Sequence, residues 1–458
     1  MGLTKVIENI FRRYLPSPFT IAVLLTVLTI VLALLFTENT SDKNHLFAIF
    51  SYWENGIWNS GLLVFAYQMM LILVLGHVLV LSKPMERLIL GITKLVKNTS
   101  NAAVLVALPT MLVAFFNWGL GLIFGAILAR KVGEYAHANN IPINYPLIGA
   151  SGYVGLMVWH GGISGSAPIK VAEEGHLADL MAGVSNLELA HQLPETLSTS
   201  LTVFSSWNIT LFLMVVIAIS VLVYFLGKKA EPQNLELKEY KFQTIDKKDI
   251  KGAEKLDYSR TAATFFGVLI LFTFLIQYLP ALKTLNITPN MLNFFMLGLA
   301  IVLHGSFKSF LVAVEEAIGD TAGILIQFPL YFGIMGIMAS SGMITGISDF
   351  FVSISNTTTL PIFTFFSAGL VNIFVPSGGG QWAIQGPLVL ESSLQLGVSL
   401  PKAVMALAYG DQITNMLQPF WALPLLGITK LKAKEILPYT LLFMLVGSSI
   451  YILGLLLF

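Results

Sequence analysis

Residues 359–395 read TLPIFTFFSAGLVNIFVPSGGGQWAIQGPLVLESSLQ, which is two apolar stretches joined by Pro376-Ser377-Gly378-Gly379-Gly380. Each stretch, 359–375 and 381–395, is shorter than the roughly 20 residues that a helix needs to cross a bilayer. Proline and consecutive glycines interrupt a helix between them. The pattern predicts a re-entrant hairpin that turns inside the membrane, which is tolerated only where the turn lines protein or a water-filled cavity.

An earlier stretch of the chain has the same form. Residues 102–116 and 119–129 are apolar, are too short to span, and are separated by Asn117-Trp118-Gly119. We therefore expect a second re-entrant hairpin over 102–129, with its tip at the asparagine.

Two longer apolar segments are interrupted by polar residues and glycines. The first, 143–169, breaks at Trp159-His160-Gly161-Gly162-Ile163-Ser164-Gly165-Ser166. The second, 403–428, breaks between Tyr409 and Pro419. Both patterns are typical of the discontinuous helices whose freed backbone groups bind substrates and ions in transporters.

The composition places the whole chain in a membrane. Of its 458 residues, 55% are hydrophobic and 11% are charged, and the mean hydropathy is +0.78. Soluble domains carry about 25% charged residues, so this chain could not cover a water-facing surface. The net charge of +1 argues against nucleic acid as a partner, and the absence of cysteine excludes disulfide and thiolate chemistry.

We expect an all-α polytopic membrane protein with about nine spanning helices, two re-entrant hairpins and two broken helices. Residues 1–17 lack a signal-peptide cleavage site and are expected to form an amphipathic helix at the membrane interface. The expected spans, of which the last is shorter, are 18–36, 61–81, 203–226, 261–279, 322–342, 436–457 and 290–304.

Positive charge indicates the orientation in the membrane. Four of the 26 Lys and Arg fall outside the segments that we assign to the cytoplasm. That assignment places the N-terminus in the cytoplasm and the C-terminus outside, with residues 228–260 as a charged cytoplasmic linker. The cytoplasmic segments are the N-terminus, 82–101, 130–142, 227–260, 305–321 and 429–435, and the four exceptions are Lys43, Lys170, Lys283 and Lys402.

The two halves of the chain match. Asn117 aligns with Asn372 and Tyr153 with Tyr409, both at an offset of about 255 residues. The charge-based orientation has the first hairpin enter from the cytoplasm and the second from outside, so the repeat is inverted. The predicted units are a first repeat over 18–227, a connecting helix over 261–279 and a second repeat over 290–458. Inverted repeats with broken helices are typical of alternating-access transporters; the alternative is a coincidental similarity of apolar segments.

Of the acidic residues, only Asp411 lies deep within an expected span. Charge inside a bilayer is costly, so this residue indicates function. A carboxylate beside freed carbonyl oxygens can hold Na⁺, or its side chain can carry a proton. A structural carboxylate that caps the broken helix is the alternative. The candidate ion-coupling residues are Asp411, which is also the candidate Na⁺ ligand, with His160, Tyr409, Gln412 and Asn415.

No Lys or Arg lies in the deep part of an expected span, so an anion would be met by helix N-termini, backbone N–H groups, hydroxyls and a co-transported cation. The glycines of the second tip can form an anion-binding nest, although close helix packing is their alternative role. Trp118 can form a wall for an apolar tail. The candidate substrate-binding residues are Asn117, Trp118, Gly119, Gly162, Ser164, Ser377, Gly378, Gly379, Gly380 and Gln381.

Other chemistry has little support in the sequence. His160 could relay protons, but a hydrogen bond from its ring to backbone explains it equally well. The sequence contains no Walker loop, dinucleotide fingerprint, metal-spaced histidine pair or G-x-S-x-G motif. We therefore expect no enzyme and no cofactor beyond Na⁺ or H⁺ as coupling ion.

At these same residues the chain resembles the bacterial short-chain fatty acid transporter family, the acetoacetate and butyrate uptake proteins. The resemblance covers nearly the whole chain. It implies a relation to ion transporters that carry carboxylates with Na⁺ or H⁺ and bind substrate between two hairpin tips. The matching stretches are Asn117–Leu122, Gly125-Ala126, Ala129-Arg130, Gly161–Ser166, Val375–Gly380, Gln385–Pro387, Ala408–Gln412 and Gln418–Pro424.

These observations predict a secondary active symporter for a short-chain fatty acid such as butyrate or acetoacetate in the bacterial inner membrane. Its expected partners are the small carboxylate, the lipid bilayer and, in a homodimer, a second copy of the chain. The alternatives are a carrier of another mono- or dicarboxylate, a passive channel, and a membrane-embedded acyltransferase. A doubly charged substrate is disfavoured because no basic residue lies deep in the membrane, and no catalytic His–Asp pair at a membrane face supports the acyltransferase.

Overall fold

The computed structural model describes residues 16–38, 44–181, 193–233, 252–283 and 288–458. The expected interfacial helix over 1–17 and the linker over 228–260 lie largely outside these residues. The regular elements of the described residues are helices, apart from one isolated bridge between Asn144 and Gln233. Seven of their helices are long and apolar enough to cross a membrane.

Seven helices coincide closely with the expected spans. α2 begins at Pro18, where Ser17 caps the helix by accepting a hydrogen bond from Thr20 N at 3.3 Å. The bounds are α2 Pro18–Phe36, α4 Ser60–Val80, α12 Ser206–Lys229, α14 Arg260–Lys283, α15 Pro289–His304, α17 Ala322–Ser340 and α23 Ala433–Leu457.

Shorter helices fill the segments between them, and several were not expected from the sequence. α3 (His45–Ile57) continues toward α4 through a short bend. Three others lie in segments expected to be connections, because each is only 11 residues long and too short to give a transmembrane signal. They are α5 (Lys83–Thr93), α16 (Phe307–Ala317) and α18 (Met343–Ser353), and the four-residue α13 is Glu254–Asp257.

Each segment predicted to form a hairpin holds two consecutive helices that pack on each other, and three of the four helices are longer than expected because they continue beyond the apolar stretch. The first pair is α6 (Thr99–Phe116) and α7 (Trp118–Ala138), with Asn117 as the C-cap of one and the N-cap of the other. The second is α19 (Leu360–Phe374) and α20 (Gly378–Leu396), with Ser377 as the N-cap of α20. We call residues 115–118 the first tip and residues 375–380 the second tip.

The two broken segments differ from each other. α21 (Leu400–Thr414) and α22 (Pro419–Thr429) are separated by one turn of 3₁₀ helix, and Pro419 starts the second piece. The first segment is more irregular. It holds α8 (Tyr145–Ser151), a 3₁₀ turn, a loop over 158–165 and the five-residue α9 (Ser166–Lys170), before α10 (His176–Met181). Three glycines in the loop, Gly161, Gly162 and Gly165, free its backbone from helical geometry.

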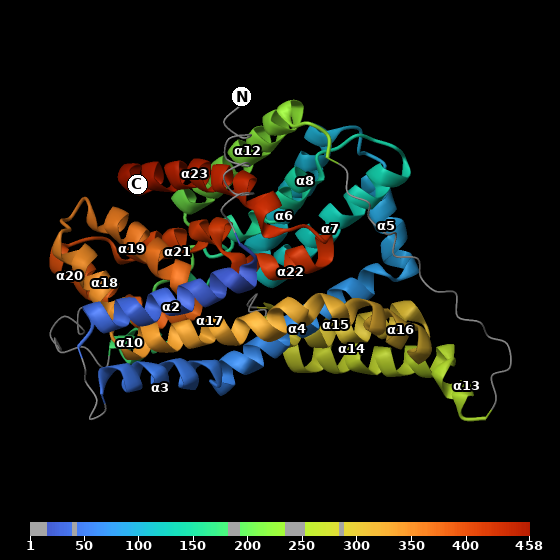
Figure 1. Ribbon diagram of the computed structural model, residues 1–458, viewed down its shortest axis with the longest axis horizontal. Coiled ribbons are helices and arrows are strands. Elements are labelled where there is room, and N and C mark those ends of the chain that lie inside the picture. The colour runs from blue at the N-terminus through green and yellow to red at the C-terminus, as the bar shows by residue number, and fades with distance from the viewer. Residues whose placement is uncertain (1–15, 39–43, 182–192, 234–251, 284–287) are drawn as a thin grey trace.

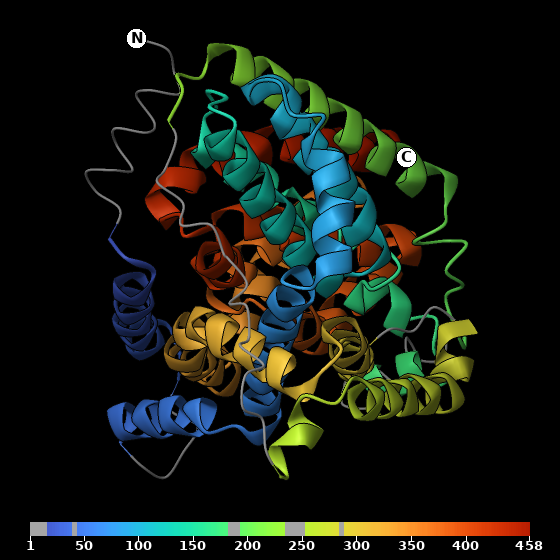
Figure 2. The same ribbon diagram turned by 90° about the vertical axis from the view of Figure 1, so that its right-hand side faces the viewer.

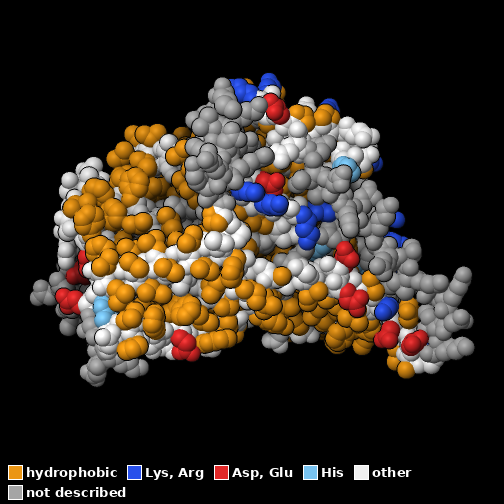
Figure 3. Space-filling model, viewed as in Figure 1, with side chains coloured by type: hydrophobic (Ala, Val, Ile, Leu, Met, Phe, Trp, Pro, Cys, Tyr) orange, Lys and Arg blue, Asp and Glu red, His pale blue; other side chains and the backbone are white. Residues whose placement is uncertain are grey.

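The helices form two bundles (Figures 1 and 2). α2, α3, α4 and α14–α17 pack on one another as the scaffold bundle. The helix pairs, α8, α9, α12 and α21–α23 form the paired-helix bundle. The two bundles meet where α17 contacts α22 and α4 contacts α7. Exposed apolar side chains cover α2 and α14, as expected for surfaces that face lipid (Figure 3).

Candidate functional site

The loop over 158–165 lies between the two tips and contacts both. On the first tip, Ser164 Oγ accepts a hydrogen bond from Trp118 N at 2.9 Å, and Ile163 N donates to Phe115 O at 2.8 Å. The neighbouring Gly162 must be glycine, because a Cβ there would lie 2.2 Å from Phe115 O. On the second tip, a Cβ at Gly378 would lie 2.8 Å from His160 Cε1.

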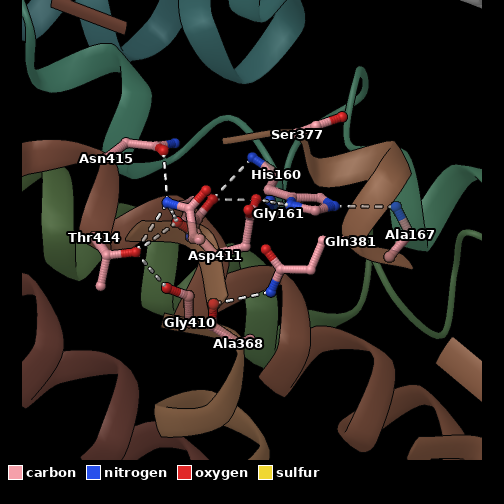
Figure 4. A network of polar contacts seen from close by, with 12 residues as sticks. His160, Gly161, Ala167, Ala368, Ser377, Gln381, Gly410, Asp411, Thr414 and Asn415 are labelled. Carbon is pink, nitrogen blue, oxygen red and sulfur yellow. Dashed lines mark hydrogen bonds and ion pairs between the residues drawn. The ribbon is translucent and has the colours of Figure 1, made fainter. Parts of the chain in front are cut away.

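At the centre of the site His160 and Asp411 form a buried pair. His160 Nδ1 contacts Asp411 Oδ2, although the two residues lie 251 positions apart in the chain. On the other side of the ring, Ala167 N donates to His160 Nε2 at 3.0 Å (Figure 4). Since Nε2 accepts, it carries no proton. One proton therefore lies between Nδ1 and the carboxylate.

Gln412 joins the first broken segment to the second. Its Oε1 accepts from His160 N at 2.8 Å and from Gly161 N at 3.0 Å. These bonds satisfy two N–H groups that the irregular loop leaves without helical partners. The position of the His160 ring is thus held by its own backbone as well as by Asp411.

Asn372 organises the break between α21 and α22. Its Nδ2 donates to Asp411 O at 2.8 Å, Thr414 Oγ1 at 2.9 Å and Asn415 Oδ1 at 2.8 Å. In return, Gln418 Nε2 donates to the backbone oxygens of Asn372 and, at 3.1 Å, of Ile373. The second helix pair is therefore tied to the broken helix by amide side chains at the level of Asp411.

Two tyrosines brace the breaks across the halves of the chain. Tyr153 OH donates to Asn415 O at 2.9 Å and Gln418 O at 3.1 Å, so the first half supports the second break. Tyr409 OH donates to Asn208 Oδ1 at 2.6 Å, and Asn208 Nδ2 donates to Gly161 O at 2.9 Å. The second half supports the first break through this relay.

Aromatic rings cover the site on the side of the scaffold bundle. Trp118 lies 5.1 Å from Trp421 and 6.1 Å from Trp159, measured between ring centroids. Phe65 of α4 lies 6.3 Å from Trp118 on the same measure. An apolar ligand group between the bundles would meet this wall.

Several buried polar atoms around the site lack a hydrogen-bond partner within the described part of the chain. The donors are Trp159 Nε1 and Gln412 Nε2, and the acceptors are Asn372 Oδ1, Gln381 Oε1 and Gln418 Oε1. An unsatisfied buried polar group costs roughly 1–3 kcal/mol. A bound anion would accept hydrogen bonds from the unpaired donors, and a bound cation would be coordinated by the unpaired acceptors. Together the two ligands would remove this cost.

A cavity of about 250 Å³ adjoins the second tip. It lies between the scaffold helices α3, α4 and α17 and the second helix pair. Asn55 and Asn59 contribute polar groups, Met335 an apolar one, and Val375 and Gly380 the edge of the tip. It is therefore a hollow between the two bundles beside the tip glycines.

The structure brings most of the predicted site residues together, with some exceptions. Gln381 turns back into its own helix pair and donates to Ala368 O at 2.9 Å. Gly119 faces Ile72 and Leu292 of the scaffold bundle rather than the loop. Within the described residues, no three His, Cys, Asp or Glu side chains gather as metal ligands, so a cation at Asp411 would depend on amide and backbone oxygens.

Sequence reasoning left several neighbours of the site unassigned. Asn372 and Gln418 carry the contacts at the second break, and Tyr153 supports that break from the first half. Asn208 holds the first break through Gly161 O. The match of Asn372 to Asn117 in the repeat was an available signal. Asn208 lies near the start of an apolar run with Ser205, Ser206 and Thr210 beside it, so nothing in its sequence context indicates its partners.

Comparison with known proteins gave a consistent result. Residues 2–458 match the family model described as "Short chain fatty acid transporter". A relative from Escherichia coli (strain K12), provisionally named a short-chain fatty acid transporter, is 36% identical over 466 residues, covering 100% of this chain and 99% of its own. A relative from Haemophilus influenzae (strain KW20) with the same provisional name is also 36% identical, covering 99% of this chain and 98% of its own.

Two solved structures show a more distant likeness. The Alcanivorax borkumensis YdaH transporter is 14% identical with a TM-score of 0.42, covering 96% of this chain and 98% of that one. Neisseria gonorrhoeae MtrF, from a class described as antimetabolite efflux pumps, is 13% identical with a TM-score of 0.39, covering 98% of this chain and 97% of that one.

Proposed function

Since the chain belongs to the short-chain fatty acid transporter family and is a multi-pass membrane protein rather than an enzyme, we propose that it is a cation-coupled symporter. Its substrates would be short-chain fatty acids such as butyrate or acetoacetate, carried across the bacterial inner membrane. The observation that carries this proposal is the set of unpaired buried donors and acceptors around Asp411. Such a set suits simultaneous binding of an anion and a cation.

The anion would bind beside the second tip. The first N–H groups of α20 point out of the helix there, and the helix dipole favours negative charge at this end. The unpaired donors Trp159 Nε1 and Gln412 Nε2 lie in the loop and helix that hold His160. The acyl tail would lie against Trp118 and its neighbouring aromatic rings. The two unpaired donors suffice for one carboxylate, and no Lys or Arg is among the described residues that form the site, so a monocarboxylate fits best.

The basic residue nearest in sequence to the first tip is engaged elsewhere. Arg130 is buried in α7, where its Nε contacts Glu134 Oε1 at 2.6 Å. It lies 12 residues from Trp118, which is about 18 Å along a helix. Arg130 is therefore too far away to neutralise the charge of a bound carboxylate, and other groups must do so.

The coupling cation would bind at Asp411 and supply that neutralisation. Carboxylate and amide oxygens suit Na⁺, and the unpaired oxygens of Asn372 and Gln418 lie at the same helix break. A proton would instead be taken by the His160–Asp411 pair. With either Na⁺ or H⁺ as the cation, the anion would bind favourably only after the cation has bound, since an uncompensated buried charge is costly. That mutual dependence is what couples the two fluxes.

The fold supports an alternating-access mechanism. We propose that the helix pairs are re-entrant hairpins of an inverted repeat with about nine spanning helices, with a cytoplasmic N-terminus and an external C-terminus. The paired-helix bundle would move against the scaffold bundle in an elevator-like or rocking motion, with the cavity beside the second tip at the moving boundary. A homodimer is part of this proposal, and light scattering of the purified protein would measure it.

The experiment is uptake and counterflow of labelled acetoacetate in proteoliposomes at about pH 7.5, with pH and Na⁺ gradients imposed separately. A slightly basic pH limits leak of the protonated acid across the bilayer. Accumulation driven by one gradient identifies the coupling ion, and competition by butyrate and succinate ranks the substrates. Flux that ignores both gradients would indicate a channel. Labelled acetoacetate that never exceeds leak, with no competition by short acids, would refute the substrate.

A further inference from the structure

A second, larger cavity lies at the far end of α22 from the Asp411 site. Its volume is about 520 Å³, and its walls come from the start of α2, the start of α17 and the turn between α22 and α23. Three lysines line it, Lys430, Lys432 and Lys434. Leu423 and Leu426 are among its apolar walls. Figure 3 shows Lys and Arg side chains gathered over this part of the surface.

The basic turn is held in an unusual conformation. Lys430 ends α22 with a φ of 61°, and Asn140 is the other non-glycine residue with positive φ in the described part of the chain. Left-handed backbone is strained for a residue with a Cβ, and glycine is the usual choice at such a helix end. This turn places Lys430 beside Lys432 and Lys434 at the edge of the cavity.

An apolar surface continues from the cavity. Pro16 and Pro18 form one of its walls, and from there α2 presents exposed side chains such as Leu24, Val27 and Leu35. A ligand with a negatively charged head and long apolar chains would match both features at once. The excess of Lys and Arg in the segments assigned to the cytoplasm predicts that this end of α22 faces the cytoplasm. The bilayer surface there carries anionic headgroups.

We propose that this cavity binds the headgroup of an anionic phospholipid. The phosphodiester would contact the three lysines, and the acyl chains would lie along α2. Glu435 does not oppose this arrangement at the turn, because its Oε2 accepts from Lys432 N at 2.7 Å and so caps its own helix. The bound lipid would bridge α17 of the scaffold bundle and α22 of the paired-helix bundle, and so would influence their relative motion.

The test is a titration of the full-length protein in detergent with phosphatidylglycerol, followed by the midpoint of thermal unfolding. Wild type should show a saturable rise in the midpoint. Each lysine removed should weaken apparent binding about 5-fold, the equivalent of about 1 kcal/mol per lysine. The variants are Lys430→Gly, Lys432→Gln and Lys434→Gln, singly and together. Glycine is chosen at 430 because it keeps the left-handed turn.

A matched variant removes three exposed lysines elsewhere, Lys97→Gln, Lys229→Gln and Lys255→Gln. It should bind phosphatidylglycerol as wild type does, and equal weakening would show that net charge alone is responsible. Phosphatidylcholine with the same chains should produce no saturable rise. A rise with glycerol 3-phosphate equal to that with the lipid would reassign the cavity to a soluble phosphate. No saturable rise in wild type would overturn the proposal.

Discussion

His160 and Asp411 come from opposite halves of the chain and meet in the protein interior, both almost completely buried. The N–H of Ala167 fixes the tautomer of the histidine, so a second proton on the ring would break that bond. As the contacts stand, the pair shares one proton between Nδ1 and the carboxylate. This is the smallest unit in which the proposed coupling can be tested.

Replacing His160 should destabilise the protein as well as alter transport. His160→Ala leaves Asp411 without its ring partner and Ala167 N without an acceptor, both in the interior. Breaking a buried pair of this kind costs about 3–5 kcal/mol. Thermal unfolding in detergent measures the loss. A variant as stable as wild type would contradict the geometry of the pair.

Trp118 should control the preference for acyl chain length. Its ring lies 6.1 Å from Trp159 and 5.1 Å from Trp421, so Trp118→Ala removes part of the proposed wall for the tail. Each methylene group in an apolar pocket contributes about 1–3 kcal/mol to binding. We therefore expect the KM for butyrate to rise about tenfold or more in this variant, while the KM for acetate, which has a shorter tail, changes less. Competition assays with the two acids give both values. Equal changes in the two KM values would show that Trp118 does not contact the acyl tail.

At the scale of the elements, the contact between the second tip and the loop over 158–165 depends on a residue without a side chain. A Cβ at Gly378 would come within 2.8 Å of both His160 Cε1 and Trp159 Cη2. Glycines at this tip thus permit close approach, and a larger residue must displace either the start of α20 or the histidine.

Gly378→Ala should therefore lower transport at least tenfold while the protein still folds into the membrane, because a misplacement of about 1 Å at a site has effects of that size. Initial rates in proteoliposomes, normalised to inserted protein, provide the measurement. The matched control is Gly346→Ala on α18, where an added Cβ meets nothing within 4 Å. Similar losses in both variants would show that the tip has no special role.

The sequence predicts some elements well because their ends carry strong local signals. Ser17 with Pro18, Asn117 and Ser377 mark helix starts by capping chemistry, and the structure begins helices at or next to each. Short helices such as α5 and α16 escaped prediction, since 11 residues of mixed polarity resemble a loop. The loop over 158–165 could be identified as a break, but its path depends on contacts with both tips.

The site itself could be predicted only in part. Asp411 and His160 stand out singly, as a charge and a glycine-flanked histidine in apolar surroundings. Their contact, and the roles of Asn372 and Asn208, depend on side chains that lie far apart in sequence and are brought together by packing. The transport roles of all these residues remain predictions.

At the scale of the whole molecule, the two bundles meet at several helix pairs, among them α17 with α22. A Cβ placed on Gly323 of α17 would lie 3.9 Å from Leu423 Cβ of α22, which suits a disulfide. The chain has no cysteine, so an introduced pair has no competitors. Gly323→Cys with Leu423→Cys should cross-link on oxidation and stop transport, and reduction should restore it. Full transport by the cross-linked protein would contradict movement between the bundles; each single variant is the control.

The measurement that tests the central claim most directly compares two transport modes of Asp411→Asn in proteoliposomes, namely accumulation driven by an ion gradient and exchange of labelled for unlabelled substrate. The control is Asp257→Asn, the same change on the exposed helix α13. We predict that Asp411→Asn loses accumulation of labelled acetoacetate under the driving gradient but retains exchange with unlabelled substrate, while Asp257→Asn keeps both. Accumulation by Asp411→Asn at the wild-type level would contradict the account, because the cation would then bind elsewhere.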